Sequence, residues 1–495
     1  MSERRAGVLL PVFSLPGEWG IGSFSAEARR FITALTEAGQ TIWQILPMGP
    51  TGFGDSPYQS FSTFAGNPYF IDLDQLINEG LLTRHDVAAF DWGVNATLVD
   101  YGALYAARTR VLRIAHSRAG APDAEYQRFC ATSAWLDDYA LFMALKAAHG
   151  DRPWSEWPDD LRHRDPAALA RAREQFADDI EFHRWTQWQF SRQWRQLRTF
   201  ANQAGVQIMG DLPIYVAMDS ADTWAHPELF ALDENLAPIE VAGVPPDGFS
   251  PTGQLWGNPV YDWDHHRATG FDWWIERLRH QLTTVDSLRL DHFRGLESYY
   301  AVPAGMPDAS HGVWRPGPGA EFFAAITDAL GELPMIVEDL GYLTDEVRHL
   351  RERSGLPGMQ ILQFAFDSRE AADYWPHNYV RDTVVYTGTH DNATLQEWFG
   401  TLSSDSQEAS RHYLSNHHTP AGELHWDFIT AAQRSVADTC IVPMADYLGL
   451  GAEGRINTPA VAEGNWRWRM SDGALTPALV RRMRQLTDLV ERSHA

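Results

Sequence analysis

A short segment near the middle of the chain, SLRLDHFRG at residues 287–295, combines an apolar strand pattern with charged residues. Arg289 and Asp291 stand two positions apart, so on a strand their side chains point to the same face. An arginine within about 4–6 Å favours the ionised form of a carboxylate, and an ionised carboxylate at a strand end can act as a nucleophile. The alternative interpretation is a buried structural ion pair, which perturbs a carboxylate in the same way.

Acidic residues also follow three other apolar runs. Glu338 ends the run in PMIVEDLG, Asp211 ends the run in VQIMGDLP, and the pair His390 and Asp391 follows in VVYTGTHDN. If these runs are barrel strands, their carboxyl ends meet at the face where the active sites of such barrels lie. Taken singly, Glu338 fits a polar strand terminus and the others fit turn residues. Their shared position at strand ends favours a common site.

Carboxylates that converge in this way suit one kind of chemistry. In a partly dry pocket they repel one another, so one takes up a proton while an arginine-paired neighbour stays ionised. One protonated and one ionised carboxyl group are what the cleavage of a glycosidic bond requires. A metal site would be the alternative, with the ligands Asp211, His292, Asp339 and His390. No H-x-x-x-H or similar ligand spacing supports it, so no metal is expected.

Eight apolar, β-rich runs predict the strands that position these residues. They span residues 6–13, 41–48, 206–214, 287–293, 334–340, 359–366, 383–386 and 439–444. Helical patterns separate most of them; residues 25–38, for example, begin at a Ser cap and end before Gly39. Buried strands that alternate with helices form a parallel sheet, and eight of them predict an α/β protein with a (β/α)8 TIM barrel. A doubly wound open sheet is the alternative fold.

Two long gaps between strands predict insertions into this barrel. We expect residues 1–495 to form a single catalytic barrel in which residues 49–205 are an insertion containing a Trp-rich helical subdomain. Residues 217–285 are the second expected insertion. Its Gly- and Pro-dense part, residues 243–259, fits an irregular loop that covers a substrate, because long loops of this kind commonly bind ligands.

The charge and the aromatic content of the chain indicate which kinds of binding partner it has. Acidic residues outnumber basic ones 65 to 40, for a formal net charge of −25, which argues against nucleic acid or an anionic membrane. The 20 Trp residues suit sugar rings as well as cores. Cys130 and Cys440 lie in unrelated segments without metal-ligand spacing, which indicates a reduced, cytoplasmic protein. The N-terminal apolar run, broken at Pro11, predicts a strand and not a signal peptide.

Several longer motifs resemble those of one enzyme family. They are GPTGFGDSPYQSFSTFAGNPY, MGDLPIYV, GVPPDGFSPTGQLWGNPVYDW, LRLDHFRG, IVEDLG, GLPGMQILQFAFD, YTGTHDN and RINTPAVAEGNWRWRM. Together they make the chain look like the 4-α-glucanotransferases, also called amylomaltases or disproportionating enzymes, of glycoside hydrolase family 77. LRLDHFRG and THDN are shared loosely with α-amylase-like enzymes, whereas the segments that begin at Gly49 and Gly243 are specific to this family.

The resemblance implies a role for individual residues. Asp291 would be the nucleophile, Glu338 the general acid/base and Asp391 the transition-state stabiliser. The substrate-binding residues would be Tyr58, Asp211, Asp247, Gln254, Trp256, Arg289, His292, His390 and Asn392. Among these, Arg289 and His390 would flank the sugar at the cleavage point.

Two positions depart from the family pattern. The family usually reads TGYGDSPYQS where this chain has Phe53, and THDNDT where it has Ala393. The first change keeps a stacking face but loses the hydroxyl of an auxiliary glucan contact. The second removes an acid just after Asp391 and affects the hydrogen bonding there. Neither change touches the three carboxylates that would be catalytic.

We therefore expect a transferase, without a cofactor, that acts on α-1,4-glucans such as maltooligosaccharides, amylose, glycogen or starch. Asp291 would form a covalent β-glycosyl-enzyme, which the 4-hydroxyl of a second glucan then opens, so that the α linkage is retained. The alternatives are an α-amylase-like hydrolase and a glycan-binding protein on an inactive barrel. The presence of Asp291, Glu338 and Asp391 argues against the inactive barrel, and the loop at residues 243–259 would favour a sugar acceptor over water.

Overall fold

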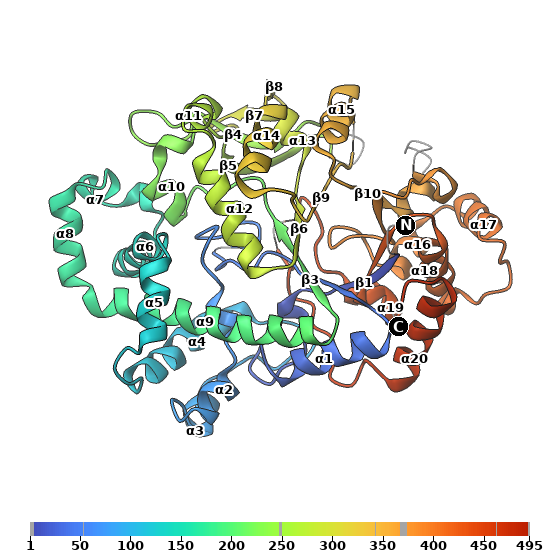
Figure 1. The fold of residues 1–495 in the computed structure, drawn as a ribbon, viewed down its shortest axis with the longest axis horizontal. Coiled ribbons are helices and arrows are strands. Elements are labelled where there is room, and N and C mark those ends of the chain that lie inside the picture. The colour runs from blue at the N-terminus through green and yellow to red at the C-terminus, as the bar shows by residue number, and fades with distance from the viewer. Residues whose placement is uncertain are drawn as a thin grey trace.

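The computed structural model describes residues 4–52, 54–246, 250–341, 343–366, 374–461 and 463–493. Its central sheet consists of eight parallel strands in the order β10-β11-β12-β1-β2-β3-β6-β9 (Figure 1). The two end strands of this order also approach each other, because the amide of Val337 in β9 donates to the carbonyl of Pro357, next to β10, at 2.9 Å. The eight expected strands are present, and the (β/α)8 barrel is confirmed.

The barrel strands are shorter than the apolar runs that predict them. They are β1 (Arg5–Leu9), β2 (Ile42–Gln44), β3 (Gln207–Leu212), β6 (Ser287–Leu290), β9 (Met335–Val337), β10 (Gly358–Ile361), β11 (Thr383–Tyr386) and β12 (Thr439–Pro443). Every residue of β2, β9, β11 and β12 is buried, as expected for strands covered on both faces. Asp291 follows β6 directly and Glu338 follows β9 directly. Both acidic residues therefore lie at the carboxyl end of a barrel strand.

A helical region occupies the chain between β2 and β3. Its helices are α2 (Leu73–Asn78), α3 (Arg84–Ala88), α4 (Tyr101–Ser117), α5 (Ala124–Thr132), α6 (Leu136–Ala148), α7 (Asp159–Arg162), α8 (Pro166–Gln175) and α9 (Ala177–Gln203). The long helix α9 buries Trp185 and Trp194 on one face and packs against α6. A hydrophobic cluster that is separate from the barrel core surrounds α6. The division of the chain into a barrel with insertions at 49–205 and 217–285 stays a prediction.

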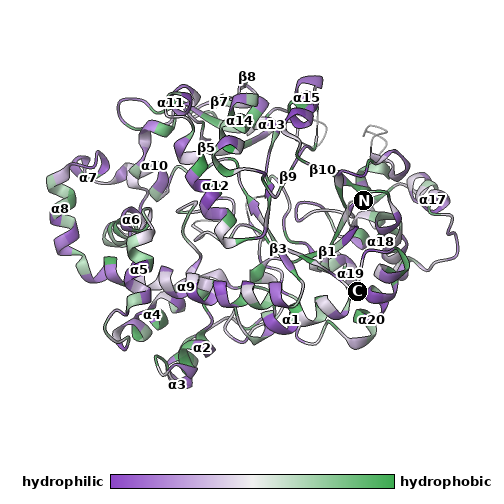
Figure 2. Cartoon of the chain, in the orientation of Figure 1, coloured by the Kyte–Doolittle hydropathy of each residue, from purple (hydrophilic) through white to green (hydrophobic). Residues whose placement is uncertain are grey.

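The remaining α-helices lie outside the region between β2 and β3. They are α1 (Ala26–Glu37), α10 (Ala221–Ala225), α11 (Trp263–Ala268), α12 (Asp272–Thr284), α13 (Arg294–Glu297), α14 (Ala320–Leu330), α15 (Asp345–Ser354), α16 (Leu395–Thr401), α17 (Ser404–Tyr413), α18 (His425–Arg434), α19 (Met444–Tyr447) and α20 (Pro477–Leu489). Ser25 caps α1 as expected, since its hydroxyl accepts from the amide of Glu27. The peripheral helix α15 is largely hydrophilic in Figure 2 and buries only Val347 and Leu350. Within the described part of the chain, no helix has both the length and the apolar character of a membrane span.

A second sheet, which the sequence analysis does not predict, lies beside the barrel. Its antiparallel strands, in the order β5-β4-β7-β8, are β4 (Glu240–Val244), β5 (Gln254–Pro259), β7 (Ser298–Pro303) and β8 (Val313–Pro316). The prediction that residues 243–259 are irregular throughout is therefore wrong. Gly and Pro hide the strand pattern there: Gly257 has a φ of +78°, and the β4–β5 register shifts between Val241 and Gly243, as at a β-bulge.

Candidate active site

Arg289 pairs with two carboxylates at the carboxyl end of the barrel. Its Nη1 lies 3.0 Å from Oδ1 of Asp291 and 2.9 Å from both carboxylate oxygens of Asp211. The sheet register places Asp211 on β3 directly opposite Arg289 on β6. Burial alone would lower the pKa of Arg289, but the two carboxylates raise that pKa well above its usual value. The predicted ion pair is present, and it keeps a fixed positive charge beside Asp291.

Asp211 lies behind this arginine, where its side chain has no exposed surface. Besides Arg289, it contacts Tyr58, whose hydroxyl lies 2.8 Å from Oδ2 of Asp211. Through these contacts Asp211 positions the side chains of Arg289 and Tyr58. A substrate-binding role for Asp211 stays a prediction.

Glu338 directly follows β9, the strand that pairs with β6. One carboxylate oxygen accepts a hydrogen bond from the amide of His292 at 2.8 Å, and the other accepts from the amide of Leu340 at 3.0 Å. Glu338 keeps some contact with solvent, yet protein surrounds most of its carboxyl group. This burial raises the pKa of Glu338 to about 8, and the charge of Asp291 acts in the same direction, against Arg289 and the two amides. Glu338 is therefore protonated at neutral pH, as a general acid must be.

His292 connects the nucleophile candidate with the acid candidate. Its φ of 51° is left-handed, a conformation that histidine adopts more readily than most non-glycine residues, and its amide donates to Glu338. Its ring meets Trp256 edge-on, with centroids 4.8 Å apart. Burial lowers the pKa of His292 to about 4, so the imidazole is neutral at pH 7.

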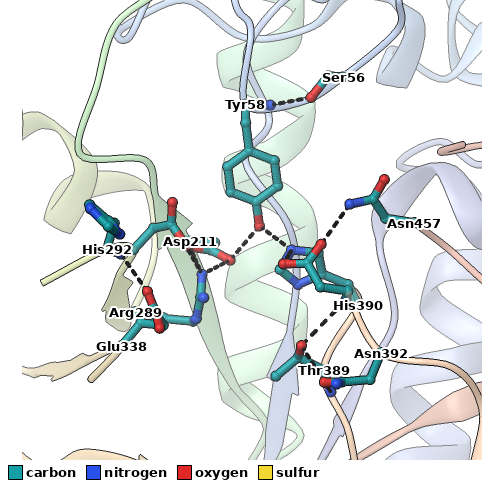
Figure 3. A network of polar contacts seen from close by, with 12 residues as sticks. Ser56, Tyr58, Asp211, Arg289, His292, Glu338, Thr389, His390, Asn392 and Asn457 are labelled. Atoms are coloured by element: carbon teal, nitrogen blue, oxygen red, sulfur yellow. Dashed lines mark hydrogen bonds and ion pairs between the residues drawn. The ribbon is translucent and has the colours of Figure 1, made fainter. Parts of the chain in front are cut away.

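Tyr58 links the β3 side of the site with the turn after β11 (Figure 3). Its hydroxyl lies 2.8 Å from Asp211 and also 2.8 Å from Nε2 of His390, and its ring stacks on His390 with an interplanar angle of 15°. A phenol has a single proton, so these distances fit a hydroxyl that donates to Asp211 and accepts from Nε2–H of His390. The substrate-binding role of Tyr58 stays a prediction.

Asp391 is held by a residue that the sequence analysis does not identify. Asn457 Nδ2 donates to Oδ1 of Asp391 at 2.6 Å, and the amide of Asn457 donates to the carbonyl of His390 at 3.1 Å. Arg455 steadies this segment, because it pairs with Glu397 at 3.1 Å and donates to the carbonyl of Asn457 at 3.0 Å. The only indication in the sequence is that Asn457 belongs to the motif RINTPAVAEGNWRWRM.

Asn392 shapes the turn that presents Asp391. Its side-chain oxygen accepts hydrogen bonds from the amide and the hydroxyl of Thr389, at 2.8 and 2.9 Å (Figure 3). The carbonyl of Ala393 accepts from Gln363 at 2.8 Å. A cavity of about 10 Å³ adjoins Ala393 and Asp446, which is room for about one water molecule. Substrate contact by Asn392 stays a prediction.

Trp256 and Gln254 lie on β5, and Trp256 contacts His292 of the site. The indole N–H of Trp256 donates to Oε1 of Gln254 at 3.2 Å. Gln59, next to Tyr58 in sequence, donates to Oδ1 of Asn258 at 2.9 Å. The small sheet is thereby attached to the segment that carries Tyr58. Two positions singled out in the sequence, Phe53 and Asp247, lie outside the described residues.

The described residues contain no group of three or more His, Cys, Asp or Glu side chains arranged to bind a metal ion. Asp339, one of the four possible ligands, turns away from Glu338: it accepts from the amide of Met359 at 2.7 Å and pairs with Arg351 at 3.3 Å. The site therefore offers Asp291 paired with Arg289 and a protonated carboxyl group at Glu338, which are the groups that an acid-assisted displacement at a sugar carbon requires.

Replacing Asn457 with Ala should lower the rate constant of the displacement about 10- to 100-fold, because a hydrogen bond to a charged group contributes about 1.5–3 kcal/mol. Asp391 would lose the donor that orients its carboxyl group. The melting temperature and the rate should be measured together with those of Asn235→Ala, a control on an exposed turn. An unchanged rate in Asn457→Ala would show that Asp391 needs no such support.

The family model, the related sequences and the solved structure that match this chain all belong to one enzyme family. Residues 10–476 match the model of glycoside hydrolase family 77, described as 4-alpha-glucanotransferase. The chain is 46% identical over 500 residues to the 4-alpha-glucanotransferase of Thermus thermophilus, and 45% identical over 502 residues to that of Synechocystis; each match covers 99% of both chains. The amylomaltase of Streptococcus agalactiae, solved with acarbose, superposes with a TM-score of 0.96 at 39% identity, covering 99% of this chain and all of that one.

Proposed function

Since this chain belongs to the 4-alpha-glucanotransferase family, glycoside hydrolase family 77, we propose that it transfers a segment of an α-1,4-glucan to the 4-hydroxyl of another glucan or of glucose. One arrangement supports this chemistry above all others: Asp291 lies 3.0 Å from the buried guanidinium of Arg289, and burial raises the pKa of the neighbouring Glu338 to about 8. An arginine-paired nucleophile and a protonated acid are the two groups that a retaining double displacement requires.

In the first step, Asp291 attacks the anomeric carbon and the glycosidic C–O bond breaks. The proton of Glu338 passes to the departing 4-oxygen, so the fragment on the reducing side of the broken bond leaves as a neutral alcohol, while the other fragment stays on Asp291. Asp391, oriented by Asn457, stabilises the positive charge that develops on the sugar ring. The product is a β-glycosyl ester on Asp291 and an ionised Glu338.

Formation of the ester prepares Glu338 for its second role. The charge of Asp291 contributes to the raised pKa of Glu338, and the ester has no charge, so the pKa of Glu338 falls while the intermediate exists. Glu338 then accepts the proton of the acceptor 4-hydroxyl, whose oxygen attacks the anomeric carbon and displaces Asp291. Two inversions restore the α linkage.

The choice of a sugar acceptor over water requires an acceptor site. Trp256 lies on β5 against His292, and the Gln59–Asn258 hydrogen bond fixes that strand to the Tyr58 segment. A sugar hydroxyl held there reacts with the intermediate faster than bulk water does, because binding keeps it close to the anomeric carbon. Maltooligosaccharides, amylose, glycogen and starch are the proposed substrates, and a cytoplasmic location is proposed because both cysteines are free.

Incubation of the protein with maltotriose alone tests this function. A transferase should produce glucose or maltose together with longer maltooligosaccharides, while the total of reducing ends stays nearly constant, because each broken linkage is replaced. In Trp256→Ala the reducing ends should rise, since water then competes better for the intermediate. Leu255→Ala is the control, because Leu255 is an exposed neighbour on the same strand.

A steady rise of reducing ends with the unmodified protein would contradict the transferase function and favour an α-amylase-like hydrolase. An unchanged ratio of transfer to hydrolysis in Trp256→Ala would contradict only the acceptor role of Trp256.

A further inference from the structure

An exposed tryptophan stands on the edge of the small sheet. All four residues of β8 are exposed, and Trp314 keeps 44% of its surface in contact with solvent. A large aromatic side chain gains free energy when its apolar surface is removed from water. The indole of Trp314 thus offers binding area that the fold itself does not use.

Two neighbours hold this indole in one place. The guanidinium carbon of Arg294 lies 4.1 Å from the ring centroid of Trp314, and the ring of Tyr300 meets the indole edge-on at 5.3 Å. Tyr300 is the cross-strand partner of Trp314 in the β7–β8 register, and its hydroxyl donates to the carbonyl of Ala309 at 3.1 Å. A ring that is already immobilised loses little conformational entropy when a ligand stacks on it.

The same contacts connect Trp314 with the active site from two directions. Arg294 begins α13, three positions after Asp291. On the other side, the amide of Ala309 donates to the carbonyl of Thr252 at 3.1 Å, just before β5 and Trp256. Figure 1 shows α13, β7 and β8 grouped on the same side of the molecule as β5. The exposed indole is therefore linked, through Arg294 and Tyr300, to the segments that follow Asp291 and precede Trp256.

We propose that Trp314 is a stacking platform for glucose units of the glucan that are remote from the cleavage point, an inference that rests on the proposed function. The C–H faces of an α-glucan pack on an indole, while the hydroxyl groups at the ring edge stay hydrated. A neutral glucan also needs no basic surface, which agrees with the net charge of −25. A long glucan bound at Asp291 reaches this platform, and a trisaccharide does not.

The test compares a long with a short substrate. In Trp314→Ala the KM for maltoheptaose should rise about three- to tenfold, the range expected for one lost aromatic contact, while KM and kcat for maltotriose stay unchanged. Trp314→Phe should restore most of the affinity for maltoheptaose. Val313→Ala is the matched control: Val313 is 47% exposed on the same strand, but successive side chains of a strand point to opposite faces.

An unchanged maltoheptaose KM in Trp314→Ala would overturn the platform and leave the transferase function standing, because maltotriose reports that function separately. An equal loss with both substrates, or an equal effect in Val313→Ala, would overturn it as well, since either result indicates a general disturbance of the small sheet. Failure of the unmodified protein to disproportionate maltotriose would contradict the proposed function itself.

Discussion

Replacing Asp291 with Asn is expected to lower glucan transfer by about 10³-fold or more, as the loss of a nucleophile does in other enzymes, while the protein still folds. An amide cannot form the glycosyl ester, so the first displacement has no nucleophile. The fold should persist because Arg289, the buried partner, keeps both hydrogen bonds to Asp211. Transfer from maltotriose and the melting temperature are the two measurements.

The result separates the catalytic role of Asp291 from a purely structural ion pair. If the pair were only structural, Asp291→Asn would lower the melting temperature and leave substantial transfer. Residual transfer by the purified variant, free of contaminating enzyme, would therefore reassign the nucleophile.

Replacing Glu338 with Gln should lower transfer from maltotriose about 10²–10⁴-fold, the contribution typical of a general acid or base. With an α-glucosyl fluoride donor the first step should survive, because fluoride leaves without a proton. The Gln side chain has nearly the same shape and its oxygen can still accept from the amide of His292. Glu332→Gln, an exposed substitution just before β9, is the matched control. Equal loss of the first step with both donors would exclude Glu338 as the acid.

The raised pKa of Glu338 predicts a dependence on pH for both activity and stability. Transfer by the unmodified protein should fall as the pH rises through about 8, because the acid form of Glu338 is lost. Between its ordinary pKa of 4.5 and about 8, the folded protein holds a proton that the unfolded chain releases, so the free energy of unfolding decreases as the pH rises. Glu338→Gln lacks this titration and should lose less stability over that interval. The same pH sensitivity of melting in both proteins would contradict the raised pKa.

The sequence predicts the parts of this protein that depend on local pattern. Apolar β-rich runs identify all eight barrel strands. The two-residue spacing of Arg289 and Asp291 predicts their ion pair, because side chains two positions apart on a strand point to the same face. The role of each carboxylate comes from the family resemblance, because spacing does not distinguish a nucleophile from a stabiliser.

The remaining features depend on contacts between distant segments. Asn457 lies 66 residues from Asp391 in sequence, and only the fold brings their side chains to 2.6 Å. The register that sets Asp211 opposite Arg289 is likewise a property of the assembled sheet. The small sheet escapes prediction because Gly and Pro interrupt β4 and β5, whose pairing across the sheet, and not local propensity, fixes their conformation.

The covalent intermediate is the most direct test of the account, because it requires the nucleophile, the acid and the sugar site to act together. The protein should be incubated with a 5-fluoro-α-glucosyl fluoride, which forms the intermediate faster than it is turned over, then digested and analysed by mass spectrometry. We expect one glycosyl ester, located on Asp291, which disappears when maltotriose is added as an acceptor and never forms in Asp291→Asn. An ester on Asp391 or Glu338, or catalytic turnover of the fluoride without any ester, would contradict the mechanism.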